Sequence, residues 1–159
     1  MRVIEATDSD FDAVIALAAQ VEEWFGPMVD DPGFHSAVRK DINRRSALMA
    51  RNCDDEAIGA LLFSHHNAPD YAVGWLVVAE PSRSAGVGQA LLAEALRRWV
   101  RPPGTVSVVA FGVDHPAARS RRFYERLGFE PAEIVADGPE GGSRQRFCLA
   151  LEAVPDWAR

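Results

Sequence analysis

The chain has 159 residues, of which 48% are hydrophobic, and a formal net charge of −6. This length and composition suit one well-buried domain over residues 1–159 and leave too little chain for two ordinary domains. The acidic balance argues against a nucleic-acid partner, and without a ~20-residue apolar run or the apolar centre of a signal peptide we expect a cytoplasmic protein with no membrane partner.

Hydrophobic periodicity divides the first half of the chain into strands and helices. Residues 7–10 are rich in helix-capping side chains and precede an apolar face at helical spacing, which predicts a strand followed by a helix. Prolines and glycines mark 24–33 as a loop, and its aromatic residues indicate that it walls a pocket. The predicted elements are a strand over 2–6, helices over 11–21 and 34–43, and strands over 46–51, 57–66 and 71–78.

The second half continues the alternation and closes with two strands. After a glycine turn, apolar residues recur at helical spacing up to a stop at 101–104. Asp114 or His115 can cap a later helix that has Pro116 in its first turn, and Gly128 stands where a left-handed C-cap residue is expected. The predicted elements are a helix over 88–100, a strand over 105–113, a helix over 116–127, and strands over 129–136 and 145–151.

The turn Arg83-Ser84-Ala85-Gly86-Val87-Gly88 follows a buried strand and opens an amphipathic helix, which makes it a candidate phosphate site. Its two glycines let backbone N–H groups approach an anion, and Arg83 can fork onto phosphate oxygens. Gly88 is not followed by the Lys-Ser or Lys-Thr of a Walker loop. A dinucleotide fingerprint needs a small residue at Leu91 and an acid within the apolar run 107–109, so both common nucleotide loops are excluded.

Metal and disulfide chemistry finds little support in the sequence. Cys53 and Cys148 lie in or beside predicted strands, and they are too few for a disulfide framework. We expect both to be reduced packing residues. The pair His65-His66 ends a strand without further ligands nearby, so no metal site is predicted.

The order of the elements resembles that of the GCN5-related N-acetyltransferase (GNAT) superfamily. Residues 83–88 fit the superfamily's Arg/Gln-x-x-Gly-x-Gly/Ala motif, which follows the fourth strand. Residues 117–129 end in Phe-Tyr-Glu-Arg-Leu-Gly-Phe and fit its later helix. The resemblance spans nearly the whole chain, and it departs at Ala117, where members often carry Asn.

The resemblance implies an α+β fold in α/β/α layers, the acyl-CoA N-acyltransferase fold. The sheet would be mixed and mostly antiparallel, with about seven strands, a splayed fourth and fifth strand, and about four helices. The implied donor is acetyl-CoA, whose pyrophosphate would rest on N–H groups of the turn and whose pantetheine arm would hydrogen-bond to strand backbone. The implied cofactor-binding residues are Val77, Val78, Arg83, Ser84, Ala85, Gly86, Val87, Gly88 and Gln89.

The implied activity is direct transfer of an acetyl group to a primary amine of a small molecule or peptide. Tyr124 is the catalytic candidate, because the family places this tyrosine beside the thioester sulfur and a phenol is protonated at neutral pH. A backbone N–H near Leu76 or Val77 would stabilise the oxyanion. The base is not fixed by the sequence, and its candidates are Glu22, Glu23, Asp30, Asp31, Glu80 and His115.

Other interpretations stay open. A noncatalytic acyl-CoA-binding module would keep the glycine turn and dispense with Tyr124, whereas the spacing disfavours a nucleotide-binding domain with an unusual loop. Arg119, Arg122 and Arg126 share a helical face that suits solvent better than phosphate. Free strand edges leave a homodimer open. The loop over 24–33, the helix after it and the turn over 137–142 are where family members usually shape the acceptor pocket.

Overall fold

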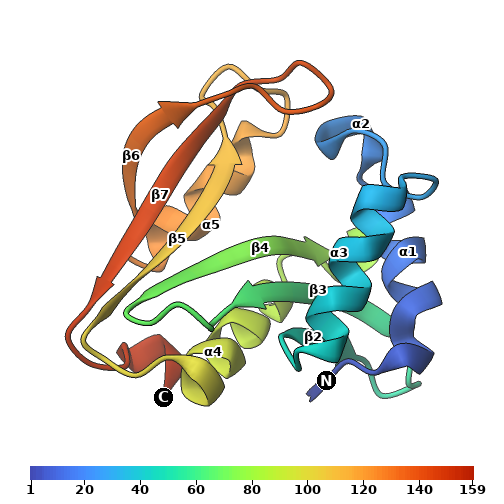
Figure 1. Cartoon of the computed structure of the whole chain (residues 1–159), viewed down its shortest axis with the longest axis horizontal. Helices are drawn as coiled ribbons and strands as arrows, with labels where there is room; N and C mark the ends of the chain where they lie inside the picture. Colours follow the sequence, from blue (N-terminus) through green and yellow to red (C-terminus); the bar gives the residue numbers. More distant parts are fainter.

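Seven strands form one mixed sheet in the order β1-β2-β3-β4-β5-β7-β6 in the computed structural model, which describes residues 1–159 (Figure 1). Neighbouring strands are antiparallel except β4 and β5, which are parallel. The predicted strands are therefore confirmed to within a few residues at each end. Their bounds are β1 (Arg2–Glu5), β2 (Ala47–Arg51), β3 (Ala57–Ser64), β4 (Asp70–Val78), β5 (Gly104–Phe111), β6 (Glu130–Val135) and β7 (Arg144–Leu151).

Helices cover the two faces of the sheet and give it two separate hydrophobic cores. On one face, α1 (Phe11–Ala19) and α3 (Pro32–Asn43) pack against β2, β3 and β4. On the other face, α4 (Val87–Trp99) and α5 (Arg121–Arg126) pack against the sheet from β2 to β7. The predicted α/β/α layering is confirmed.

One helix that was not predicted overlaps the start of the segment that was expected to be a loop, 24–33. The single turn α2 (Glu22–Phe25) ends at Gly26, which has a positive φ of 93°. The Glu22 carboxylate accepts hydrogen bonds from the N–H groups of Met28 and Val29, at 2.7 and 3.2 Å. These bonds fold residues 28 and 29 back onto α2 and fix the end of this short helix. With α2 included, the chain has five α-helices where about four were predicted.

The predicted helix from Pro116 begins later than expected. A 3-10 turn at Ala118–Ser120 precedes α5, which starts only at Arg121. The reason is the buried His115 imidazole, whose Nδ1 accepts the Ala117 N–H at 3.0 Å and holds the chain in a turn around the ring. The predicted C-cap is confirmed, because Gly128 has a φ of 96°.

The two halves of the sheet are covered unequally. Helices pack on both faces of β2, β3 and β4, whereas β5, β7 and β6 carry α4 and α5 on one face only. In Figure 1 the second half rises away from β4 as a separate wing, with its other face open. All but the last residue of β6 are exposed. The space between the halves is where the candidate site lies.

Candidate functional site

An extra residue in β4 separates the two halves of the sheet. Leu62 pairs with Trp75 and Phe63 with Val73, so Gly74 has no partner on β3 and forms a β-bulge. The parallel pairing of β4 with β5 also ends here, because it covers only Asp70–Val73 of β4. The predicted splay of these two strands is therefore present, and its apex is the bulge.

Beyond the bulge, β4 offers unpaired main-chain groups to the gap. The Ala79 N–H donates to Ile58 O at 2.8 Å, and alternation along a strand then points the polar groups of Val77 toward β3 as well. Those of Leu76 and Val78 point the other way, into the gap. Among these groups, the Val78 carbonyl accepts a hydrogen bond from Arg83 Nε at 3.1 Å. The N–H groups of Leu76 and Val78 face the gap and remain free.

The segment Arg83–Gln89, here called the donor turn, presents a row of main-chain donors. Gly86 caps α4 in the left-handed conformation with a φ of 82°, and no side chain caps the helix. None of the N–H groups from Ser84 to Gly86 donates to a protein acceptor, and the first N–H groups of a helix have none within it. A Cβ on Gly86 would meet nothing within 4 Å. The donor turn is thus open to an anion.

Gly88 joins the donor turn to the later motif. A Cβ at Gly88 would lie 3.2 Å from Phe123 Cζ and 3.7 Å from Val78 Cγ2. The absence of a side chain therefore lets α5 pack against the start of α4 and the end of β4. The structure brings together the two segments that carried the family resemblance.

Tyr124 lies next to this contact and is 8% exposed. Its ring packs edge-on against Phe123 and Phe129, at 5.0 and 5.4 Å between centroids. Burial raises the pKa of its phenol above the ordinary value, so the group stays protonated at neutral pH. Among the polar side-chain atoms that are shielded from solvent, only Trp75 Nε1 lacks a hydrogen-bond partner. The Tyr124 hydroxyl also makes no hydrogen bond within the protein. It is therefore not one of the shielded atoms, and its oxygen must reach accessible space.

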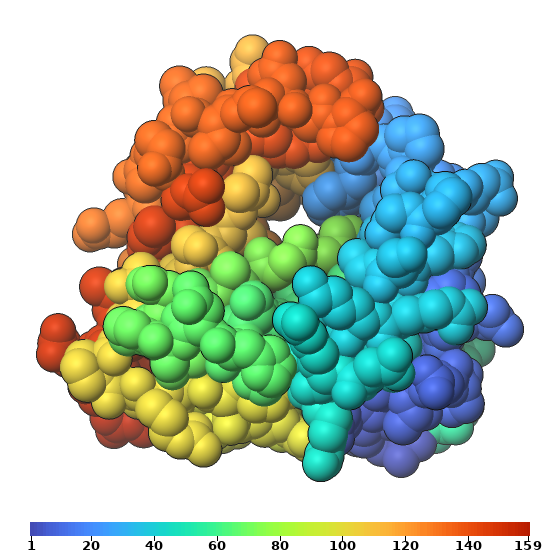
Figure 2. Space-filling model, viewed as in Figure 1, coloured from blue at the N-terminus to red at the C-terminus, as the bar shows by residue number.

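A pocket of about 460 Å³ lies where α2, the β5–α5 connection and the β6–β7 turn converge. Figure 2 shows an opening bounded by the blue segment around α2, the orange segment before β7 and the green β4. The pocket lining is mainly polar. It includes Glu23, Trp24, Asp114, His115, Glu140 and Ser143.

Three side chains at one wall of this pocket are here called the Glu140 cluster: His115 and Glu140 line the pocket, and Arg144 is buried against Glu140. The Glu140 carboxylate accepts from His115 Nε2 at 2.8 Å and from Arg144 Nη2 at 2.5 Å. Burial alone would raise the pKa of the Glu140 carboxyl, but the hydrogen bonds from Arg144 and His115 outweigh it and lower that pKa to about 2. Both His115 and Arg144 lie against the Phe111 ring, at 4.2 and 4.7 Å.

The family model described as "Acetyltransferase (GNAT) family" matches residues 14–129, which is most of the chain and includes both motifs. The chain belongs to the GNAT acetyltransferase family. This membership supports acetyl-CoA-dependent acetyltransferase activity and agrees with a donor turn built for an anion. No curated protein matches the chain in sequence.

Solved structures share the GNAT fold at low sequence identity. Ribosomal-protein-alanine N-acetyltransferase from Brucella melitensis is 20% identical, with a TM-score of 0.72 over 95% of this chain and 100% of that one. Ard1 from Thermoplasma volcanium is 15% identical, with a TM-score of 0.74 over 94% and 97%. The protein yncA from Salmonella typhimurium, solved with its cofactor acetyl-CoA, is 16% identical, with a TM-score of 0.71 over 98% of both chains.

For a GNAT enzyme, the base candidates named from the sequence divide into engaged and free groups. Glu22 holds the loop after α2, and Asp31 caps α3 by accepting the Phe34 N–H at 3.0 Å. His115 has both ring nitrogens engaged, since Nδ1 accepts from Ala117 and Nε2 faces Glu140. Glu23 lines the pocket and makes no hydrogen bond, whereas Asp30 and Glu80 are exposed and do not line it.

Sequence patterns did not point to Arg144 or to the pairing that makes Glu140 part of the site. Arg144 opens a strand whose pattern is otherwise apolar, and charged residues are rarely buried unless paired. Its acidic partner Glu140 is only four residues away, but Trp24, whose carbonyl also accepts from Arg144, lies at the other end of the chain. Asp114 and Ser143 were also missed. The Ser143 hydroxyl donates to Asp114 and lowers the pKa of that carboxyl.

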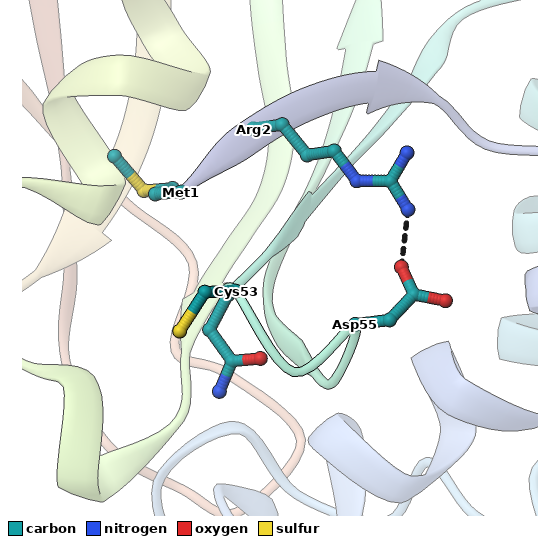
Figure 3. Close-up of a pocket in the computed structure, with 5 residues that line it drawn as sticks. Met1, Arg2, Cys53 and Asp55 are labelled. Carbon is teal, nitrogen blue, oxygen red and sulfur yellow. Dashed lines mark hydrogen bonds and ion pairs between the residues drawn. The ribbon is translucent and has the colours of Figure 1, made fainter.

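A second hollow of about 330 Å³ lies on the outer surface, where Met1 and Arg2 face the β2–β3 turn (Figure 3). Arg2 pairs with Asp55 there, and both side chains are well exposed. Cys53 lines this hollow and is exposed, so its prediction as a packing residue was wrong, because it lies in the solvated turn rather than in β2. Cys148 is half-buried, and both thiols are free as predicted.

Two further features of the chain concern metals and membranes. No group of three or more His, Cys, Asp or Glu side chains is arranged to hold a metal ion. None of the helices combines the length and the apolar character that crossing a membrane requires.

Arg119, Arg122 and Arg126 are exposed, so their side chains reach solvent.

Proposed function

We propose that this GNAT protein transfers the acetyl group of acetyl-CoA directly to a primary amine of a small molecule or peptide. The observation that carries the proposal is the unpartnered N–H row of the donor turn beside the unpaired edge of β4. The Tyr124 hydroxyl, free and protonated, belongs to the helix that packs against the same turn. A single sheet spanning the chain supports the proposal that residues 1–159 work as one domain.

The donor would be held mainly by main chain. The N–H groups from Ser84 to Gln89 suit a pyrophosphate, and Arg83 is close enough to turn its guanidinium onto it. The pantetheine arm would run along β4 near Val77 and Val78, where the free polar groups are those of Leu76 and Val78. Acetyl-CoA supplies a thioester carbonyl that an amine can attack.

The chain's own groups would then manage charge and protons. The amine nitrogen forms a bond to the carbonyl carbon while the carbon–sulfur bond breaks, and the electron pair leaves with sulfur. A free N–H of β4, such as that of Leu76, would stabilise the oxyanion on the way. Tyr124 would donate its proton to the departing thiolate. The amine proton would leave through water, with Glu23 as the free pocket carboxylate.

Ligand stabilisation and thiol release test this proposal in sequence. Acetyl-CoA should raise the melting temperature, because a ligand that binds only the folded state stabilises it, while ATP and NAD should not. Free CoA thiol should then appear with some primary amines of a broad panel, and mass spectrometry should find the acetyl group on nitrogen. No thermal shift at saturating acetyl-CoA would contradict the donor assignment. Binding without thiol release would instead favour the noncatalytic module.

A further inference from the structure

Two segments from opposite halves of the sheet meet across the mouth of the gap and form what we call the bridge. On one side is the end of α2, and on the other are β5 and the β6–β7 turn. The rings of Phe25 and Phe111 lie 5.0 Å apart. A Cβ on Gly26 would lie 3.1 Å from the Cβ of Pro139, so the two main chains approach closely there.

Arg144 ties the bridge together with hydrogen bonds to both sides. Its Nη2 donates to the Trp24 carbonyl of α2 at 3.3 Å and to Glu140 at 2.5 Å. Its Nη1 donates to the Gly142 carbonyl of the β6–β7 turn at 3.2 Å. The side chain is only 8% exposed, so this charge depends on its protein partners.

Glu140 is the one negative partner that fixes Arg144 in this position. Its two oxygens bind both Nη atoms of Arg144 and the Nε2 of His115. Because His115 Nδ1 accepts from the Ala117 main chain, its Nε2 must carry the hydrogen that Glu140 accepts. A neutral amide at position 140 would turn its own N–H donors toward a donor of either His115 or Arg144, and it would leave the buried guanidinium without a counter-charge.

The bridge closes the gap on the side away from β4. The opening in Figure 2 is bounded by the segments that carry these contacts and by β4, so it is framed on all sides rather than open as a groove. Within the sheet, the two halves are joined through β4 and β5 at only four residue pairs. The width of the opening near the pocket therefore depends on the bridge.

We propose that Glu140 is a positioning residue that holds the bridge closed and thereby restricts the acceptor to amines on slender, unbranched chains. This inference rests on the proposed amine acetylation. Glu140 acts through Arg144 and His115 on the shape of the opening, and it takes no part in proton transfer. A bulky group beside the amine carbon would need a wider opening than the closed bridge leaves, because the Phe25–Phe111 contact and the close approach of Gly26 to Pro139 hold α2 against the β6–β7 turn.

The central test compares two acceptors that share a CH2–NH2 group, n-butylamine and 2,2-dimethylpropylamine, in wild type and Glu140→Gln. The variant should raise kcat/KM for the bulky amine relative to the linear one by about tenfold, the range expected when a hydrophobic constraint on size is relaxed. The KM for acetyl-CoA should stay within about twofold, since the donor turn is untouched. An unchanged ratio of the two amines would overturn the proposal.

Two further variants separate positioning from general damage. Glu133→Gln removes an ion pair with Arg146, at 2.9 Å on the exposed face of β6 and β7, and it should leave the ratio unchanged. Phe25→Ala weakens the bridge from its other side and should relax the ratio in the same direction as Glu140→Gln. The double variant should show less than the product of the two single effects, because both act on one contact. Independent effects would contradict a shared bridge.

Hydrogen exchange makes the inference testable even if the proposed function fails. Wild type that releases no thiol with any amine refutes amine acetylation but says nothing of the bridge. In Glu140→Gln, the amides of residues 22–27 and 138–144 should then exchange about tenfold faster than in wild type and Glu133→Gln, because local opening becomes easier. Equal exchange rates would refute the bridge on their own.

Discussion

The donor turn and the Glu140 cluster belong to opposite halves of the sheet and have opposite chemistry. The donor turn presents main-chain N–H groups that no protein atom satisfies. In the Glu140 cluster, every charge is met by another side chain or by a carbonyl. Since unsatisfied donors are costly unless water or a ligand meets them, the first arrangement suits binding. The second suits holding a fixed shape.

The largest expected effect tests whether the donor turn works through backbone geometry. Gly88→Val adds a branched side chain at a position where even its Cβ would lie 3.2 Å from the Phe123 ring, so α5 must move away from the turn. We expect acetyl-CoA affinity to fall by about 100-fold or more, equivalent to ~3 kcal/mol. Titration calorimetry with acetyl-CoA measures it.

Gly86→Ala is the matched control for that variant. Its added Cβ meets nothing, and its cost is the positive φ of 82°, about 1–2 kcal/mol of folding stability. Acetyl-CoA affinity should fall less than in Gly88→Val, because the added methyl group lies in the open space of the donor turn and does not push α5 away. If the two variants bind acetyl-CoA equally, close packing at Gly88 is not what shapes the donor turn.

The next effect concerns Tyr124, whose hydroxyl is free while its ring is packed. Tyr124→Phe keeps the ring contacts with Phe123 and Phe129 and removes only the proton donor. We expect kcat to fall by about 100-fold, typical of a lost general acid, with acetyl-CoA affinity within about twofold. Steady-state kinetics with the best amine acceptor measures both.

The second tyrosine provides the control. The Tyr71 hydroxyl accepts a hydrogen bond from the Arg101 N–H at 3.2 Å. Tyr71 lies where β4 and β5 are still paired, away from the gap. Tyr71→Phe should cost about 1 kcal/mol of stability and leave kcat unchanged. A rate in Tyr124→Phe that matches wild type would remove Tyr124 from the mechanism.

A smaller effect is expected at Arg83, the only charged side chain of the donor turn. Its Nε donates to Val78 O, and its guanidinium lies 5.4 Å from the Trp24 ring centre. Arg83→Ala should weaken acetyl-CoA about tenfold, as for the loss of one charge-assisted hydrogen bond. The loss should shrink with added salt. A salt-independent loss would assign Arg83 to the packing of Trp24 instead.

The smallest effect tests the other side of the comparison through pH. The pKa of Glu140 is about 2 in the folded protein, below its ordinary 4.5, so its stabilisation is complete above pH 4.5 and is lost as pH falls through 2. The difference in melting temperature between wild type and Glu140→Gln should be constant above that window and shrink within it. A difference independent of pH would mean that the charge of Glu140 contributes nothing.

The sequence predicted the geometry of the donor turn far better than that of the Glu140 cluster, for a physical reason. Gly86, Gly88 and the Phe123-Tyr124 pair form short motifs, because backbone geometry constrains neighbours in the chain. Glu140 and Arg144 are four residues apart, but the groups that bury and fix the pair, His115 and the Trp24 carbonyl, lie far away in the chain, and no local pattern marks them. The same limit applies to α5, whose late start depends on a side chain turned inward.

The strands were predicted closely because alternation and apolar runs mark them directly. The one-turn α2 was not, since a carboxylate reaching two amides after it sets its end. Because one side chain sets the shape of this pocket wall, a substitution at Glu22 alone would alter it. The donor, by contrast, follows from the family.

The β-bulge at Gly74 reverses which face of the sheet each later residue of β4 occupies. Because successive residues of a strand face opposite ways, the extra residue acts as a frameshift: Tyr71 and Val73 face the α4 core, but Trp75 and Val77 face the α1 and α3 core. Deleting one residue here would exchange the two faces all the way to the donor turn. The count of residues in this strand is therefore constrained more strictly than their identity.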